Sequence, residues 1–127
     1  MNTGVELVVV FTDDVEAIDI VPEGSAIRYH ERYPDGTNAN FAQLEADGLI
    51  IVRTYERGVE NETLACGTGV VAVAITASLT KNLPTPISLR VRGGDTLQVD
   101  FAREGDEVSD ISLTGSAKVV FTGNVEV

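Results

Sequence analysis

The longest hydrophobic run of the chain covers residues 70–79 and is interrupted only by Thr76 and Ser78. It is longer than an ordinary strand of about four to eight residues and has no strict alternation, so its length predicts a helix despite its β-branched residues. A helix that is apolar on nearly every side belongs in the middle of a core. The pattern therefore predicts a fold that wraps around this helix.

Shorter hydrophobic runs on both sides of this helix predict strands, because they are bounded by turn signals rich in Gly, Pro and Asp. The expected strands cover residues 5–11, 38–44, 49–56, 87–92, 96–102, 108–113 and 117–121. A second helix is expected from Pro22 to about Tyr29. The short loops at 46–48, 93–95 and 114–116 are typical of antiparallel neighbours. The expected fold is α+β, with a curved, mostly antiparallel sheet around one central apolar helix and one more helix outside.

Size and composition limit the class of protein. At 127 residues the chain is expected to be one domain, and 43% hydrophobic with 23% charged residues is typical of a soluble globular protein. The net charge of -11 argues against a nucleic-acid partner, because phosphate binding needs a basic face. No leader-like start and no run of about eighteen apolar residues is seen, which predicts a cytoplasmic protein without a membrane partner.

A glycine-rich turn with the single cysteine of the chain, Cys66-Gly67-Thr68-Gly69, comes directly before the apolar helix. The first N–H groups of a helix have no helical partner and the dipole is positive there, so the turn is suited to an anion and favours a thiolate. The glycines allow a ligand to approach the backbone, and Thr68 adds a hydroxyl. A carboxylate beside a thiol indicates chemistry on a carboxylic acid, although a lone cysteine is also a common inert core residue.

Other chemistries find little support. The single histidine, His30, lies in the stretch Arg28-Tyr29-His30-Glu31-Arg32, which resembles a solvated helix face and disfavours a cysteine–histidine hydrolase. Lys81 and Lys118 are expected at a helix end and in an exposed strand, which disfavours pyridoxal phosphate as a cofactor. Three acids are better explained as turn and cap residues than as metal ligands: Asp13, Asp14 and Asp19. What remains is a thiolate acting as a base on a carbon acid, or a thiol acting as the matching acid.

Three segments resemble the C-terminal catalytic signature of the diaminopimelate epimerase family: Thr54-Tyr55-Glu56-Arg57-Gly58, Glu62-Thr63-Leu64 and Ala65-Cys66-Gly67-Thr68-Gly69. Further matches in the family's order extend the resemblance over nearly the whole chain: Asp13-Asp14-Val15, Glu31-Arg32-Tyr33-Pro34 and Asn38-Ala39. The resemblance implies a barrel-like half domain and an isomerase without cofactor or metal. In that mechanism one cysteine thiolate removes the α-proton and a second thiol returns one from the opposite face, interconverting LL- and meso-2,6-diaminopimelate for lysine and peptidoglycan synthesis.

The resemblance also implies roles for individual residues. Cys66 matches one of the two catalytic cysteines, and Gly67 and Thr68 match the groups that hold the reacting α-carboxylate. Glu56 matches a carboxylate that tunes the thiol and meets the substrate ammonium, although it could simply end a strand. Arg57 and Asn38 match ligands of the distal end of the substrate, although a surface arginine and a turn asparagine are the simpler readings.

The chain departs from the family in two respects. It has one cysteine where the family has two, so we expect the C-terminal half of an epimerase without its N-terminal half, inactive alone and prone to self-association. At residues 3–7, Val5 and Leu7 stand where the family has a substrate ligand and a histidine. Two alternatives stay open: a proline-racemase-like or other isomerase of the same superfamily, and a non-catalytic ligand-binding domain that has kept the fold.

Overall fold

The computed structural model describes residues 7–34, 36–63, 67–92, 94–105, 107–115 and 118–126, the last range as backbone only. The elements in chain order are β1 (Leu7–Phe11), the 3-10 helix η1 (Val15–Ala17), α1 (Ile20–Arg28), β2 (Asn38–Leu44), β3 (Ile50–Glu56), β4 (Asn61–Thr63), α2 (Gly67–Lys81), β5 (Ile87–Arg90), β6 (Thr96–Glu104), β7 (Glu107–Gly115) and β8 (Lys118–Glu126). The strands form one eight-stranded sheet in the order β1-β2-β3-β5-β6-β7-β8, with β4 paired to β3.

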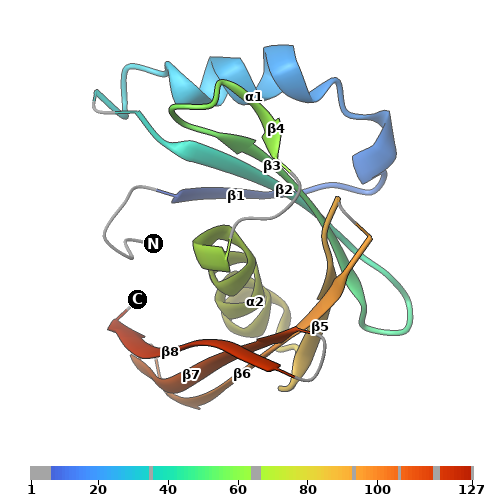
Figure 1. Ribbon diagram of the computed structural model, residues 1–127, viewed down its shortest axis with the longest axis vertical. Helices are drawn as coiled ribbons and strands as arrows, with labels where there is room; N and C mark the ends of the chain where they lie inside the picture. The colour runs from blue at the N-terminus through green and yellow to red at the C-terminus, as the bar shows by residue number, and fades with distance from the viewer. Residues whose placement is uncertain are drawn as a thin grey trace.

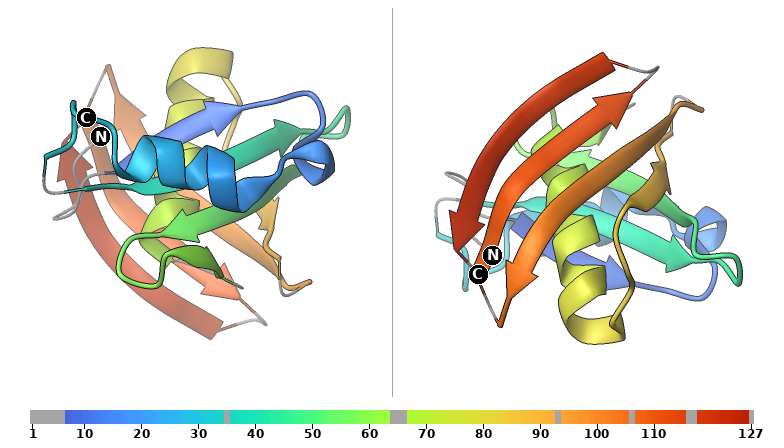
Figure 2. Two further views of the ribbon diagram at one scale, coloured as in Figure 1. Left: turned by 90° about the horizontal axis from the view of Figure 1, so that it is seen from above. Right: turned by 90° about the horizontal axis from the view of Figure 1, so that it is seen from below.

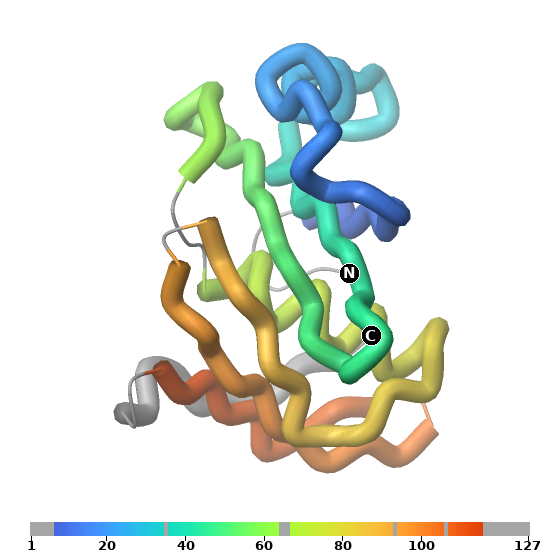
Figure 3. Tube along the Cα trace, turned by 90° about the vertical axis from the view of Figure 1, so that its right-hand side faces the viewer, coloured from blue at the N-terminus to red at the C-terminus, as the bar shows by residue number. Residues whose placement is uncertain are grey.

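The sheet curls around α2, so that β1 to β4 lie on one side of this helix and β6 to β8 on the other, with β5 between them (Figure 1). The views from above and from below show the same curl, with β6, β7 and β8 crossing behind the helix in the first and in front of it in the second (Figure 2). The chain trace from the side shows β5 connecting the two parts (Figure 3). Pairing is antiparallel except for β1 with β2 and β3 with β5, which are parallel. The predicted α+β fold, a curved and mostly antiparallel sheet around a central apolar helix, is confirmed.

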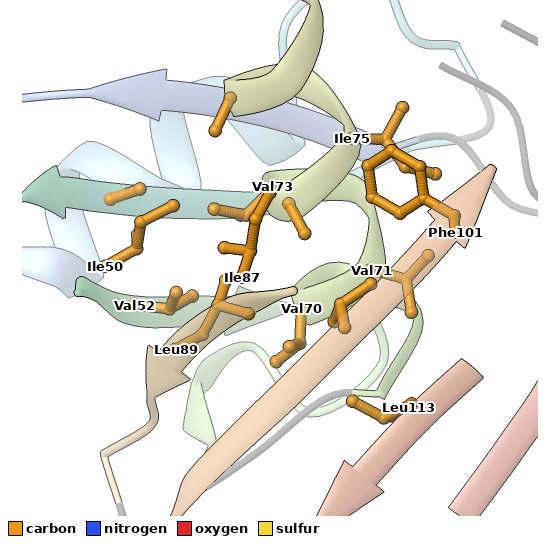
Figure 4. Close-up of a cluster of buried hydrophobic side chains, with 14 of the residues drawn as sticks. Ile50, Val52, Val70, Val71, Val73, Ile75, Ile87, Leu89, Phe101 and Leu113 are labelled. Atoms are coloured by element: carbon orange, nitrogen blue, oxygen red, sulfur yellow. The ribbon is translucent and has the colours of Figure 1, made fainter. Parts of the chain in front are cut away.

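Helix α2 is buried along most of its length, as its apolar sequence predicts. Its residues from Gly69 to Ile75 are all buried, as are Ala77 and Ser78. The side chains labelled in Figure 4 come from α2 and from β3, β5, β6 and β7: Ile50, Val52, Val70, Val71, Val73, Ile75, Ile87, Leu89, Phe101 and Leu113. Because apolar strands surround the helix on several sides, a polar face on α2 would have cost the protein core contacts.

Helix α1 covers the outer face of β2 and β3, opposite α2 (Figure 1). Alternate residues of β3 therefore have different neighbours: Ile50 and Val52 belong to the core around α2, whereas Tyr55 belongs to a second cluster under α1. Both faces of β3 are thus covered, because Arg53 and Tyr55, on the side away from α2, are buried as well. The predicted outer helix is confirmed, and its Gly24 packs against Tyr55.

Some boundaries differ from the predicted ones. Helix α1 begins at Ile20, so Pro22 lies in its first turn, and it ends at Arg28, so the charged stretch that follows is not helical. Strand β4 and the 3-10 helix η1 occupy segments for which no element was predicted, because three-residue elements of mixed polarity leave no periodic pattern. Strands β6 to β8 extend two to five residues further at their C-terminal ends than predicted. Neither helix of the described chain has the length and hydropathy needed to cross a membrane.

A buried ion pair joins η1 and β4 to β3. Arg53 is only 6% exposed, and its Nε and Nη2 each donate to one carboxylate oxygen of Glu62 at 2.9 Å. Its Nη1 donates to the carbonyls of Val15 and Ile18, also at 2.9 Å. The hydrogen bond to Arg53 lowers the pKa of Glu62, and the same bond raises the pKa of Arg53. A fork of this geometry satisfies both charges, which makes the burial of Arg53 tolerable.

Candidate functional site

The end of the β2–β3 ladder that lies away from the hairpin loop brings the first candidate residues together. Asn38 is the first residue of β2 and Glu56 is the last residue of β3. The antiparallel register pairs Ala39 with Tyr55, so its next step places Asn38 opposite Glu56. Directly opposed residues of an antiparallel pair point to the same face of the sheet, so the two side chains share one face at one end of the ladder.

That face is the one covered by α2. Asn40, which shares its side of β2 with Asn38, lies directly against α2: a Cβ added at Gly69 would overlap the Oδ1 of Asn40 and lie 3.2 Å from its Cγ. Asn40 is fully buried and is about 7 Å from Asn38 along the strand. The first turn of α2 and the Asn38–Glu56 end of the ladder are therefore neighbours on the same side of the sheet.

Asn38 and Arg57 are in direct contact. Asn38 is 9% exposed, and its Oδ1 accepts the backbone N–H of Arg57 at 2.7 Å. Because a backbone N–H can only donate, the amide oxygen must face it, and the Nδ2 of Asn38 is directed the other way as a donor. Arg57 begins a tight turn after β3, in which the Glu56 carbonyl accepts the N–H of Glu60 at 2.9 Å. Asn38 thus helps to define where the arginine leaves the strand.

The start of α2 is open. Gly67 and Thr68 are exposed, whereas Gly69 is buried against Asn40. A Cβ at Gly67 would meet only Leu113 Cδ2, at an ordinary 3.5 Å. The N–H groups of a first helical turn have no helical partner, so this end of α2 is chemically suited to a carboxylate. Cys66, the residue before α2, lies outside the described residues, so the placement of its thiol stays a prediction, as does the thiol-tuning role of Glu56.

Of the two residues that depart from the family pattern near the start of the chain, Leu7 lies in the part that the structure describes. It is buried in β1, where the parallel register sets it beside Asn38. An apolar side chain therefore lies next to the candidate site at the position where the resemblance implies a histidine. Val5, the second departure, lies outside the described residues.

Two further polar residues shape this region and were not singled out from the sequence. Asn40 accepts a hydrogen bond from the Thr54 hydroxyl at 2.9 Å and donates to the Val8 carbonyl at 3.2 Å. An asparagine between Ala39 and Phe41, at an inward position of a predicted strand, was the signal that could have revealed it. Glu60 gave no such signal, because a charged residue in a loop is ordinary, yet it is hydrogen-bonded to three other residues.

Comparison with known proteins agrees with the resemblance. The family model described as diaminopimelate epimerase matches residues 1–120. The diaminopimelate epimerase of Aquifex aeolicus is 46% identical over 128 aligned residues, covering 98% of this chain and 44% of the relative. Those of Chlorobaculum tepidum and Archaeoglobus fulgidus are 39% and 45% identical, covering 98% and 96% of this chain and 48% and 41% of the relatives. The chain spans a little under half the length of these relatives. With its sequence matched almost from end to end, the chain belongs to the diaminopimelate epimerase family.

Proposed function

We propose that residues 1–127 are a single domain equivalent to the C-terminal half of a diaminopimelate epimerase, and that they carry one half of its active site. The observation that supports this is the convergence of Asn38, Glu56 and Arg57 at the open start of α2, in a chain of this family. The isomerase interconverts LL- and meso-2,6-diaminopimelate without a cofactor. The other half supplies the second cysteine, so the chain alone does not epimerise.

Each residue has a defined part in the proposed chemistry. The N–H groups of Gly67 and Thr68 hold the α-carboxylate, which also stabilises the negative charge that develops when the α-proton leaves. Cys66 as thiolate takes this proton and becomes a thiol, and a thiol of the other half donates a proton to the opposite face of the carbanion. Reaction in the other direction exchanges these roles. Glu56 faces the substrate ammonium and adjusts the ionisation of the thiol.

Arg57 and Asn38 bind the distal carboxylate of the substrate. A guanidinium suits this task because it donates two parallel hydrogen bonds to a carboxylate. The Nδ2 of Asn38 adds a third donor, since its Oδ1 is used by the Arg57 backbone. A substrate with a second charged end is thereby favoured over proline, which has none.

The setting of the enzyme follows from the same proposal. A catalytic thiol must stay reduced, which the cytoplasm ensures. The partners are the diaminopimelate substrate and the complementary half domain, with self-association as a further expectation for an isolated half. We propose no nucleic-acid or membrane partner.

The test is the alkylation rate of Cys66 in the purified chain, with and without meso-diaminopimelate. We expect faster reaction than for a free model thiol, because the helix start favours the thiolate, and we expect the diamino diacid to slow it. Lysine, which lacks the distal carboxylate, and proline serve as comparison ligands. Equal protection by proline would favour a racemase-like isomerase. A slow, unprotected thiol would favour the non-catalytic domain.

Matched variants locate the distal subsite. Arg57→Lys keeps the charge but loses the two-pronged geometry, so we expect weaker protection by diaminopimelate and unchanged alkylation without ligand. Arg90→Lys, at an exposed position of β5, is the control and should protect like the original chain. Full-rate epimerisation by the purified chain alone would refute the proposed half-site.

A further inference from the structure

Glu60 adopts an unusual backbone conformation beside the candidate site. It lies in the turn between β3 and β4, and its φ of 57° is in the left-handed region that residues with a Cβ seldom occupy. Such a conformation persists where the surroundings hold the residue in place. Glu60 is held by the hydrogen bond of its N–H to the Glu56 carbonyl and by the hydrogen bonds of its side chain.

The carboxylate of Glu60 accepts hydrogen bonds from three parts of the fold. Arg28, at the end of α1, donates from Nε and lies within 3.1 Å of Oε2 through both Nε and Nη2. The Tyr55 hydroxyl of β3 donates to Oε1 at 3.1 Å, and the Gly58 N–H of the turn itself donates to Oε2 at 3.2 Å. Burial alone would raise the pKa of Glu60, but these donors together lower it, so the group is an anion at neutral pH.

The turn that contains Glu60 begins with Arg57, one of the candidate ligand-binding residues. Its first peptide N–H, that of Arg57, is fixed by Asn38 at 2.7 Å, and its last N–H, that of Glu60, is fixed by the Glu56 carbonyl at 2.9 Å. The side chains of Arg28 and Arg57 also lie close to the same residue, Gly36. A Cβ added at Gly36 would lie 2.8 Å from the Arg28 Cζ and 2.9 Å from the Arg57 Cδ, so both arginines pack against the same piece of backbone.

We propose that Glu60 is a positioning residue. By tying the turn to α1 and to β3, it sets the direction in which Arg57 and Asn38 present their donors to the distal carboxylate of a diacid ligand. This inference rests on the proposed function and extends it to a residue that does not touch the ligand.

The test uses Glu60→Gly, because glycine accepts a positive φ without strain while the carboxylate is removed. We expect the Arg57 amide to exchange its hydrogen about tenfold faster by NMR, since the loss of one charged anchor loosens the turn. We expect the meso-diaminopimelate concentration that half-protects Cys66 to rise about tenfold. The alkylation rate without ligand should be unchanged, which separates positioning from a general loss of folding.

Asn82→Gly is the matched control. Asn82 also has a positive φ, 52°, but it follows the far end of the fifteen-residue helix α2, about 20 Å from its start. This variant should leave the exchange rate of the Arg57 amide and the half-protecting concentration of meso-diaminopimelate unchanged. Should Glu60→Gly fail to fold, Glu60→Gln carries the test: it retains one acceptor oxygen but no charge, and the half-protecting concentration should rise by about threefold.

Each other outcome overturns the inference. If diaminopimelate protects the original chain and Glu60→Gly equally, Glu60 does not position the ligand site, even if the Arg57 amide exchanges faster. If Asn82→Gly weakens protection as strongly, the effect belongs to the backbone change and not to the carboxylate. If the original chain is not protected at all, the proposed function fails first and the inference fails with it, a result that is plainly different from the other two.

Discussion

Gly69→Ala tests the contact that places α2 against β2. Replacing a glycine inside a helix by alanine ordinarily stabilises a protein by about 1 kcal/mol, because the unfolded chain loses freedom and the helix gains propensity. Here the new Cβ would overlap the Asn40 Oδ1, and Asn40 is fully buried between two strands and the helix. The side chain cannot rotate away without breaking its bonds to the Thr54 hydroxyl and the Val8 carbonyl.

The magnitude follows from these contacts. Overpacking a close-packed site costs about 1–3 kcal/mol, and each of the two Asn40 hydrogen bonds contributes about 1 kcal/mol. Against a gain of about 1 kcal/mol from propensity, we expect Gly69→Ala to reduce the free energy of unfolding by about 2 kcal/mol. For a chain of 127 residues this corresponds to a fall of about 8 °C in the melting temperature.

The assay is urea unfolding followed by circular dichroism, arranged as a double-mutant cycle. Asn40→Ala removes the obstacle, so Gly69→Ala in that background should be neutral or stabilising, giving a coupling of about 2 kcal/mol. Gly67→Ala is the control, since its Cβ meets only Leu113 Cδ2 at 3.5 Å and should change stability little. A stabilised Gly69→Ala protein, or a coupling under about 0.5 kcal/mol, would refute the argument.

Three further predictions concern the outer layer. Gly24→Ala should lower the melting temperature instead of raising it, because the added Cβ would overlap the Tyr55 side chain under α1. Arg53→Met should reduce the free energy of unfolding in urea by about 3 kcal/mol, since it leaves Glu62 and two carbonyls without their buried donor. Acid titration should show a related effect: the pKa of Glu62 is held below its ordinary 4.5, so the stabilisation is complete above that pH and is lost as pH falls through the lower, folded-state value. Glu62→Gln should flatten this acid limb of the stability curve, and an unchanged acid limb would count against the ion pair.

The sequence contained most of the fold because its strongest patterns are local. Strand β2 has the predicted bounds, and the long apolar run became the central helix, since length and polarity pattern alone decide such elements. The parallel pairings of β1 with β2 and of β3 with β5 were not predictable in this way, because they join segments far apart in the chain. Strand β4 was missed because three residues carry no period.

The candidate site was predictable in a different way. Its residues came from a motif, and the motif cannot say which side chains touch. The hydrogen bond from the Arg57 N–H to Asn38 joins residues nineteen positions apart, and the Arg28–Glu60 pair joins residues thirty-two apart. Arg28 was expected on a solvated helix face, but it ends α1 as the partner of a carboxylate beside the site. Such pairs depend on how elements are stacked, which periodicity does not encode.

The end of β3 is where the two layers of the fold jointly determine the candidate site. Alternate residues of β3, including Thr54 and Glu56, lie on the side of the strand that faces α2. The Thr54 hydroxyl donates a hydrogen bond to Asn40, which packs against Gly69 in the first turn of that helix. Tyr55 lies on the opposite side of β3, which faces α1, and its hydroxyl donates a hydrogen bond to Glu60. A distal carboxylate held by Arg57 and an α-carboxylate held at the helix start would therefore be spaced by contacts on opposite faces of one strand. In the proposed function, the distance between the two carboxylate subsites would therefore depend on β3, which is buried on both of its faces.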